Sequence, residues 1–274
     1  MFDDDERDQA AKAPERRGPG AFLSDIIAAT GFLTRLPVGA RVSPAPDLRQ
    51  AMSVFPLAGL LVGLLSAAAL LVATRLGLSP LAAAAIAVGT HFLVTGGLHE
   101  DGLADTADGF WGGDKPQRRL AIMRDSAIGT YGVLALLLAV ILKCALIAEL
   151  AASNTGGAAA VLVASGAISR HAMVALMAAN DSARSDGLAV SAGKPSAEAR
   201  RQSLILAVAI AAVALWWAIG ILAVVLSLLL AQGAVSGMAL LARQKIGGYT
   251  GDVCGAVQQA SEIGVLAGAA MVAG

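Results

Sequence analysis

Three aspartates at helical spacing are the residues of this sequence best suited to chemistry. Asp101, Asp105 and Asp108 lie at positions i, i+4 and i+7 of the run TGGLHEDGLADTADGFWGG, residues 95–113. On a helix continuing from the preceding apolar segment, they would share one face within two turns. Carboxylates placed in this way repel one another unless a cation neutralises them. Mg²⁺ fits best, because it takes oxygen ligands and leaves positions for substrate phosphates.

A histidine, His99, lies two residues before the first of these aspartates. Its ring could orient a carboxylate, hydrogen-bond to a phosphate or act as a base. An alternative interpretation is that the acids form a solvated helix face or cap the ends of helices. The regular spacing of three acids beside a histidine, at the end of an apolar segment, favours a metal–phosphate site.

Other polar segments of the chain offer groups that bind phosphate. Arg124 and Asp125 precede a helix start flanked by glycine, an arrangement that binds anions. The nearby Arg118 and Arg119 are equally consistent with anchors at a membrane surface. Two further loops lie on the same side, an acidic one at 178–187 and a glycine-rich one that ends in Thr-Gly-Asp. Backbone N–H groups of the glycine-rich loop can cradle phosphate, although such turns are also common between spans. The candidates in these loops are Asn180, Asp181, Gly247, Gly248, Thr250 and Asp252.

The amino-acid composition places most of the chain in a lipid bilayer. Of its 274 residues, 57% are hydrophobic and 15% are charged, and the mean hydropathy is +0.70. Soluble domains are roughly 45–50% apolar. The formal net charge is zero, which gives no indication of a nucleic-acid partner. Cys144 and Cys254 stand apart from any Cys/His cluster, so neither a disulfide framework nor a zinc site is expected.

Seven apolar segments approach the roughly 20 residues that a membrane-spanning helix needs. We therefore expect an all-α, polytopic membrane protein with about seven transmembrane helices, or six if residues 203–274 hold two spans. Turns are expected at SNTGG (153–157) and near WWAIG (216–220). The predicted spans are residues 53–74, 78–98, 129–152 and 156–179, two segments within 203–242, and 253–273.

The parts outside these spans are assigned by composition. Residues 21–36 predict an interfacial or re-entrant helix. Residues 1–20 are expected to be a disordered cytoplasmic tail, and residues 21–274 a single transmembrane catalytic domain. Seventeen of the twenty Lys and Arg residues fall on one side of this topology and only Arg75 on the other. The positive-inside rule then turns the N-terminus and the aspartate-rich run toward the cytoplasm, which predicts a bacterial inner-membrane protein.

Several ionisable residues lie inside the predicted spans. An ionisable group at the centre of a span costs about 2.5–3.5 kcal/mol on insertion scales, so Lys143, Arg170 and Glu262 require partners or a polar cavity. An ion pair of Lys143 or Arg170 with Glu262 is one hypothesis. His91 and His171 also lie inside apolar segments, and the sequence indicates no clear partner for either.

These residues give the sequence a resemblance to the cobalamin synthase family of membrane enzymes. The resemblance runs from about residue 22 over nearly the whole chain. Its most specific motif is His-x-Asp-Gly-x-x-Asp-x-x-Asp-Gly, residues 99–109, and the chain does not depart from the pattern at the acidic positions. The other matching segments are FLTRLPV (32–38), FPLAGLLVG (55–63), IMRDSAIGTYG (122–132), SRHAM (169–173) and GGYTGDVCGAVQQASE (247–262).

The resemblance implies the assembly of the nucleotide loop of vitamin B12. Members of the family join adenosylcobinamide-GDP to α-ribazole or its 5′-phosphate and release GMP, with Mg²⁺ required. For this chain, the three aspartates of the run are implied to bind the metal. One of them or His99 would take the proton of the attacking 3′-hydroxyl, and Arg124 and the loop 247–252 would hold phosphates.

Two other functions share some of these features. Membrane transferases acting on CDP-alcohols or prenyl diphosphates also place aspartate-rich motifs at cytoplasmic helix ends. A transporter could use the ionisable residues within the spans as an ion relay, although transporter sites lie near mid-bilayer between repeats and no repeat is evident. A purely structural protein leaves the clustered acids unexplained. The base of the ribazole, its phosphorylation state and the number of assembled copies, a homo-oligomer included, are left open.

Overall fold

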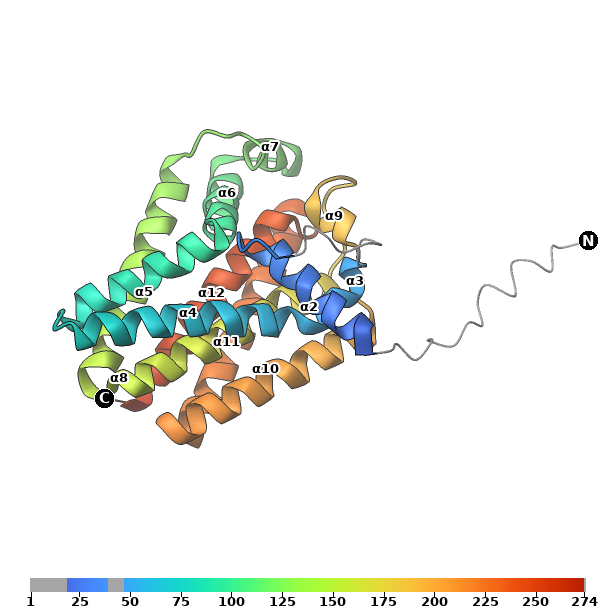
Figure 1. Cartoon of the computed structure of the whole chain (residues 1–274). Coiled ribbons are helices and arrows are strands. Elements are labelled where there is room, and N and C mark those ends of the chain that lie inside the picture. The colour runs from blue at the N-terminus through green and yellow to red at the C-terminus, as the bar shows by residue number, and fades with distance from the viewer. Residues whose placement is uncertain (1–18, 39–46, 274) are drawn as a thin grey trace, which may run out of the picture.

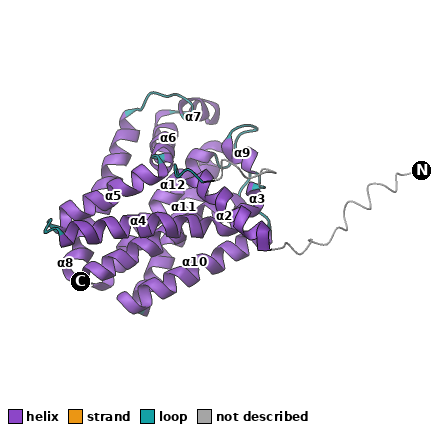
Figure 2. Cartoon of the chain, viewed as in Figure 1, coloured by secondary structure: helices purple, strands orange, loops and turns teal. Residues whose placement is uncertain are grey.

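The fold is a bundle of helices of unequal length. The computed structural model describes residues 19–38 and 47–273, so the tail predicted at residues 1–20 lies mostly outside the described residues. No strand occurs in these two ranges (Figure 2). The elements, in chain order (Figure 1), are α2 (Pro19–Leu33), α3 (Leu48–Ala51), η1 (Met52–Val54), α4 (Phe55–Arg75), α5 (Pro80–Thr95), α6 (Leu98–Gly112), α7 (Pro116–Ile122), α8 (Thr130–Ala179), α9 (Leu188–Ala192), α10 (Ala197–Ala218), α11 (Ile221–Ile246) and α12 (Gly251–Ala273).

Several of these helices are long and apolar enough to cross a membrane, which confirms the predicted polytopic helical class. Within the described ranges there are four, namely Leu48–Arg75, α8, α10 and α11, or five if the bent pair α5 and α6 forms one span. Seven spans were predicted. The described ranges contain fewer spanning helices than predicted, partly because the predicted span 253–273, which forms α12, is not among them. Its polar residues Gln258, Gln259 and Glu262 lower its hydropathy.

The predicted spans 129–152 and 156–179 form one 50-residue helix, α8, with a break inside it. Asn154 has non-helical angles of φ −152° and ψ 96°, and its side-chain Oδ1 accepts a hydrogen bond from the N–H of Gly157 at 2.9 Å. The expected turn SNTGG is therefore reduced to a kink at one residue. Figure 1 shows the chain changing direction within α8, so its two halves act as separate helices in the bundle.

The predicted span 78–98 ends earlier than expected. α5 stops at Thr95, and α6 begins at Leu98 after a bend of 91°. Gly96 and Gly97 between them have φ of 68° and 71°, a left-handed conformation that glycine adopts at little energetic cost. The expectation that the aspartates lie on a helix continuing from this span is therefore wrong. They lie on a separate helix, α6, that leaves α5 nearly at a right angle.

Helices α4 and α8 approach so closely that their backbones are in contact. A β-carbon added at Gly59 would lie 2.1 Å from the carbonyl oxygen of Gly166, and one added at Gly63 would lie 2.6 Å from that of Leu162. Small residues of this kind let helices pack where lipid removes the hydrophobic driving force between them. The second half of α8 is consequently fixed against α4.

Replacing one of these glycines is expected to weaken the bundle. Gly59→Ala forces α4 away from α8, and overpacking of this kind costs about 1–3 kcal/mol, so we expect a clearly lower Tm in detergent. Gly89→Ala is the matched control, because nothing lies within 4 Å of a β-carbon at that helical position. Equal melting temperatures for the two variants would contradict the close contact.

Candidate active site

The three aspartates of α6 differ in their surroundings. Asp101 is exposed, Asp105 is half-buried and Asp108 is buried. The carboxylate of Asp108 accepts hydrogen bonds from the N–H groups of Gly129, at 2.7 Å, and Gly132, at 2.9 Å. Asp108 thus caps the N-terminus of α8, a position where the helix dipole favours negative charge. In the described ranges, no three His, Cys, Asp or Glu side chains are gathered closely enough to hold a metal ion.

A fourth carboxylate, Asp252 in the first turn of α12, lies near the acids of α6. A β-carbon at Gly102 would lie 2.7 Å from the backbone oxygen of Asp252, and one at Gly255 would lie 3.0 Å from that of His99. The two helices therefore meet backbone to backbone at these glycines. This contact, which sequence reasoning did not foresee, brings carboxylates from distant parts of the chain into one region.

The acids raise the pKa values of their neighbours, as expected for an anionic cluster. They lie on α6 and in the first turn of α12, outside the four helices that are long and apolar enough to cross a membrane alone. Partial burial, followed by the negative charges of Asp252, Asp101 and Asp108, raises the pKa of Asp105 to about 7. Burial also raises the pKa of Asp252, opposed by the nearby guanidinium of Arg184. Their ionised forms are disfavoured unless a positive charge is supplied.

A cavity of about 280 Å³ lies beside this cluster, between α2, α4, α6, α8, α9 and α12. The polar residues of its lining, which we call the polar wall, are His99, Asp101, Ser182, Arg184, Asp186, Thr250 and Asp252. The large hydrophobic residues of its lining, which we call the apolar wall, include Phe32, Met52, Phe55, Met173, Met177, Leu188 and Val190. α9 borders the cavity between Gly187 and Gly193, whose φ values are 102° and 74°. Asp101 and Asp252 meet at this cavity, whereas Asp105 and Asp108 are not part of its lining.

His99 differs from most buried polar side chains. It is 1% exposed, and neither ring nitrogen has a hydrogen-bond partner among the described residues. Buried polar groups are nearly always hydrogen-bonded, and exceptions call for an explanation. His99 belongs to the lining of the cavity, and both of its ring nitrogens are buried in the protein.

Backbone hydrogen bonds join two of the predicted loops. The N–H of Tyr249 donates to the carbonyl of Asp181 at 3.0 Å, and the N–H of Ala183 donates to that of Tyr249 at 2.8 Å. A β-carbon at Gly248 would lie 2.3 Å from the same Asp181 oxygen, so only glycine fits there. Gly247 ends α11 with φ 83°. These two glycines therefore shape the loop and bring Thr250 and Asp252 to the cavity.

The other predicted phosphate-binding residues have partners elsewhere. Asn180 is buried, donates to the carbonyl of Leu176 and accepts from Arg243. Asp181 is exposed and pairs with Lys194, which lowers its pKa. The carboxylate of Asp125 accepts from the N–H of Ala127. None of the three belongs to the lining of the cavity.

Arg184, rather than Arg124, lies at the cavity. Arg124 is exposed and forms an ion pair with Asp186. The guanidinium of Arg184 lies 3.6 Å from the carboxylate of Asp252 and donates to the carbonyl of Leu120. Its position between Asp181 and Asp186, in the acidic loop after the span 156–179, is the only signal for it in the sequence.

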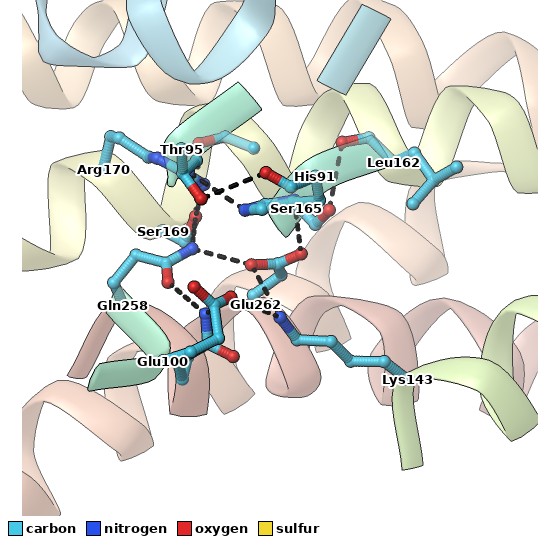
Figure 3. A network of polar contacts seen from close by, with 12 residues as sticks. His91, Thr95, Glu100, Lys143, Leu162, Ser165, Ser169, Arg170, Gln258 and Glu262 are labelled. Atoms are coloured by element: carbon cyan, nitrogen blue, oxygen red, sulfur yellow. Dashed lines mark hydrogen bonds and ion pairs between the residues drawn. The ribbon is translucent and has the colours of Figure 1, made fainter. Parts of the chain in front are cut away.

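A buried ion network lies where α5, α6, α8 and α12 meet, and Figure 3 shows its side chains pointing toward one another. At its centre is Glu262, 2% exposed. One carboxylate oxygen lies 3.3 Å from His91 Nδ1 and the other 3.3 Å from Lys143 Nζ. The side-chain amide of Gln258 donates to the second oxygen at 2.7 Å. The hypothesis that Lys143 pairs with Glu262 is confirmed.

The network extends from Glu262 to two further charges. Nη2 of the fully buried Arg170 lies 3.1 Å from His91 Nε2. Glu100 lies 3.9 Å from Lys143 Nζ and accepts a hydrogen bond from Gln259 at 2.7 Å. Because Glu100 stands between His99 and Asp101, the network attaches the start of α6 to α8 and α12. The sequence indicated no role for Glu100.

Both histidines that lacked a partner in the sequence have one in the structure. His91 bridges Glu262 and Arg170. His171 Nδ1 lies 3.0 Å from the hydroxyl of Ser203 on α10. Neither contact could be read from the chain, because each joins helices that are distant in sequence.

Together these features define a multi-pass helical membrane protein with a carboxylate-bordered cavity, a class to which membrane-embedded transferases belong. A family model described as cobalamin-5-phosphate synthase matches residues 25–270. The chain therefore belongs to the cobalamin-5-phosphate synthase family, as the motif 99–109 predicted.

Relatives of known name agree with this assignment. Adenosylcobinamide-GDP ribazoletransferase of Azorhizobium caulinodans is 43% identical over 251 residues, which is 90% of this chain and 95% of that protein. The enzyme of the same name from Brucella anthropi is 43% identical over 254 residues, 92% of this chain and 98% of that protein. One from a Sinorhizobium species is 42% identical, covering 92% and 98%. No solved structure matches the chain significantly.

Removing one charge of the buried network is expected to destabilise the bundle strongly. Lys143→Met leaves Glu262 and Glu100 without their nearest cation, and breaking a buried pair in this way costs about 3–5 kcal/mol. We expect Tm to fall by about 10 °C, and Lys143→Met combined with Glu262→Gln to recover part of that loss. Glu198→Gln, which removes the exposed partner of Arg201, is the control and should leave Tm unchanged. A small loss for Lys143→Met would mean that the network is not ionised.

Proposed function

We propose that the chain transfers the cobinamide phosphate of adenosylcobinamide-GDP to α-ribazole, or to α-ribazole 5′-phosphate, with release of GMP. Membership of the family and the name shared by its relatives support this activity. The observation in the chain that carries it is the meeting of Asp101 and Asp252, from α6 and α12, at one cavity beside His99. A phosphoryl transfer needs such a site to neutralise charge and to orient the attacking hydroxyl.

The proposed reaction exchanges one phosphorus–oxygen bond for another. The 3′-hydroxyl oxygen of the ribazole bonds to the cobinamide-linked phosphorus. The bond from that phosphorus to the bridging oxygen breaks, and GMP leaves with this oxygen and its electron pair. We propose that Asp101 or His99 takes the hydroxyl proton, since both border the cavity. Arg184, on the polar wall, would hold a phosphate oxygen in place.

We propose Mg²⁺ as the cofactor, held by Asp101 and Asp105. Mg²⁺ is usually bound by one or two carboxylates together with substrate phosphates, so two suffice. Asp108, the third predicted ligand, has both carboxylate oxygens bonded to the start of α8. The raised pKa of Asp105, caused partly by Asp101 and Asp252, supports a site that favours a cation. When bound, the ion neutralises negative charge on the pyrophosphate.

We also propose that this site faces the cytoplasm, where nucleotide substrates are made. The asymmetric distribution of Lys and Arg supports this orientation in a bacterial inner membrane. Transfer from a CDP-alcohol or a prenyl diphosphate is the alternative within membrane transferases. The released group distinguishes them, because the cobamide reaction gives GMP whereas the alternatives give CMP or pyrophosphate.

Loss of the carboxylates of α6 is expected to stop the reaction. Asp101→Asn and Asp105→Asn should each lower kcat for GMP release by at least about a hundredfold, since each removes charge stabilisation made in the transition state. The assay uses detergent-solubilised protein, adenosylcobinamide-GDP, α-ribazole and Mg²⁺. Asp114→Asn, at an exposed position after α6, is the control. Near-normal GMP release by both α6 variants would refute the metal assignment.

Mg²⁺ binding is expected to depend on pH through Asp105. Because the pKa of this carboxyl is raised to about 7, it is largely protonated at pH 6 and ionised at pH 8, and protons compete with the cation. Mg²⁺ affinity, measured by calorimetry, should therefore be about tenfold weaker at pH 6 than at pH 8. Asp105→Asn should remove most of this pH dependence, whereas Asp114→Asn should retain it. A pH-independent affinity in the unmodified protein would exclude Asp105 as a ligand.

A further inference from the structure

The start of α6 is not held in place by the helix before it. Gly96 and Gly97, with φ of 68° and 71°, separate it from α5, and nothing lies within 4 Å of a β-carbon built at Gly97. Glycine at left-handed angles gives the backbone a freedom that other residues lack. Contacts with neighbouring helices must therefore set the direction in which α6 leaves this bend.

One of these contacts is a side-chain hydrogen bond from α12. Nε2 of Gln259 donates to Oε1 of Glu100 at 2.7 Å, and it is the only side-chain hydrogen bond between α6 and α12 within residues 19–38 and 47–273. The other close approaches of the two helices, at Gly102 and Gly255, are backbone contacts. A hydrogen bond weakens when its geometry is distorted, so this one restrains the orientation of α6 as well as its distance from α12.

The burial of Glu100 is not explained by the stability of the fold. Its side chain is 12% exposed and lies 3.9 Å from Lys143 Nζ, among the side chains of the ion network (Figure 3). Its other oxygen, Oε2, is buried without a hydrogen-bond partner among the described residues. Burying a carboxylate costs free energy that so few contacts offset only in part.

The partners of Glu100 do not depend on it. The amide of Gln259 also donates to Oε1 of Gln258 at 2.8 Å, and Lys143 has Glu262 at 3.3 Å. Removing the carboxylate of Glu100 therefore strands neither partner, and the contacts around Glu262 persist. What is lost is the directional contact between α6 and α12.

We propose that Glu100 is a positioning residue, whose hydrogen bond to Gln259 holds the first turn of α6 so that Asp101 meets Asp252 at the cavity. Glu100 lies between His99 and Asp101, which both border the cavity, so a rotation of α6 displaces them together. A misplacement of about 1 Å lowers a reaction rate by up to about a hundredfold. This inference rests on the proposed function and adds to it a residue that touches no substrate.

Substitution of Glu100 separates its hydrogen bond from its charge. Glu100→Leu should lower kcat for GMP release about thirtyfold, with the KM of both substrates changed less than about threefold. Tm should fall by less than about 3 °C, since no buried partner is stranded. Glu100→Gln keeps an oxygen that accepts from Gln259 and should retain kcat within about threefold. Glu149→Leu, at an exposed position on α8, is the control.

A double-mutant cycle tests whether the two side chains act through one contact. Gln259→Leu removes the same hydrogen bond from the other side and should lower kcat by a similar factor. Glu100→Leu combined with Gln259→Leu should be no slower than the slower single variant, because both remove one shared interaction. Losses of kcat that multiply in the double variant would overturn the proposal.

A second measurement follows the contact between α6 and α12 without turnover. The thiol of Cys254, beside Gly255 on α12, is 3% exposed and borders the cavity. In a Cys144→Ala background it is the only remaining cysteine, and a maleimide reaches it only when neighbouring segments separate. Labelling should be at least about fivefold faster in Glu100→Leu, because local opening becomes more frequent. Glu100→Gln and Glu149→Leu should leave the labelling rate unchanged.

The two measurements separate failure of this proposal from failure of the proposed function. If Glu100→Leu speeds labelling but even the unmodified protein forms no GMP, the proposed function fails while Glu100 still positions α6. If the unmodified protein forms GMP and Glu100→Leu does so at the same rate, the positioning role fails alone. A fall in kcat with unchanged labelling would also overturn it, since Glu100 would then act on the reaction directly.

Discussion

An ionised carboxylate cannot remain inside an apolar helical bundle unless cations and hydrogen-bond donors surround it. Glu262 meets this requirement with Lys143, His91 and Gln258, which come from three helices. The contacts with Lys143 and His91 each fix one helix relative to another, whereas Gln258 lies on α12 together with Glu262. The ion network therefore determines the arrangement of α5, α8 and α12, and through Glu100 it determines where α6 begins.

The position of α6 decides which groups face the cavity. The bend at Gly96 and Gly97 turns the helix away from α5, and the contact of Gly102 with α12 brings it beside Asp252. Asp101 is thereby exposed at the cavity, whereas Asp108, two turns later, is directed to the N-terminus of α8. The carboxylates of α6 thus serve two purposes: Asp101 belongs to an anionic site at one end of the helix, and Asp108 caps α8 at the other.

Much of the fold could be predicted because apolar segments, prolines and glycines mark helix ends along the chain. The helices at 55–75, 197–218 and 221–246 follow the sequence pattern closely. The bend before α6 could not be predicted, because a glycine pair is equally compatible with a helix end, a kink or a loop. Helical spacing predicts that Asp101, Asp105 and Asp108 share one face. It carries no information on α8, whose first N–H groups bind the carboxylate of Asp108.

Contacts between distant segments limited the prediction of the site in the same way. His91 and Glu100 were passed over since their partners, Arg170 and Gln259, lie far away in sequence. The sequence predicts a phosphate contact for Arg124 because it stands beside a helix start, whereas only the folded chain shows that Arg184 lies close to Asp252. Residue type and local spacing identified the chemistry of the region; the pairing of helices decided which residues carry it.

The contact between Gly59 and Gly166 has a consequence for how molecules enter and leave the cavity. Phe55, Met173 and Met177 belong to α4 and α8, whose backbones already touch and cannot separate without losing that contact. On another side lies α9, five residues long and bounded by Gly187 and Gly193. Adjustment of the cavity to a molecule that enters or leaves it is therefore easier at α9 than at the side formed by α4 and α8.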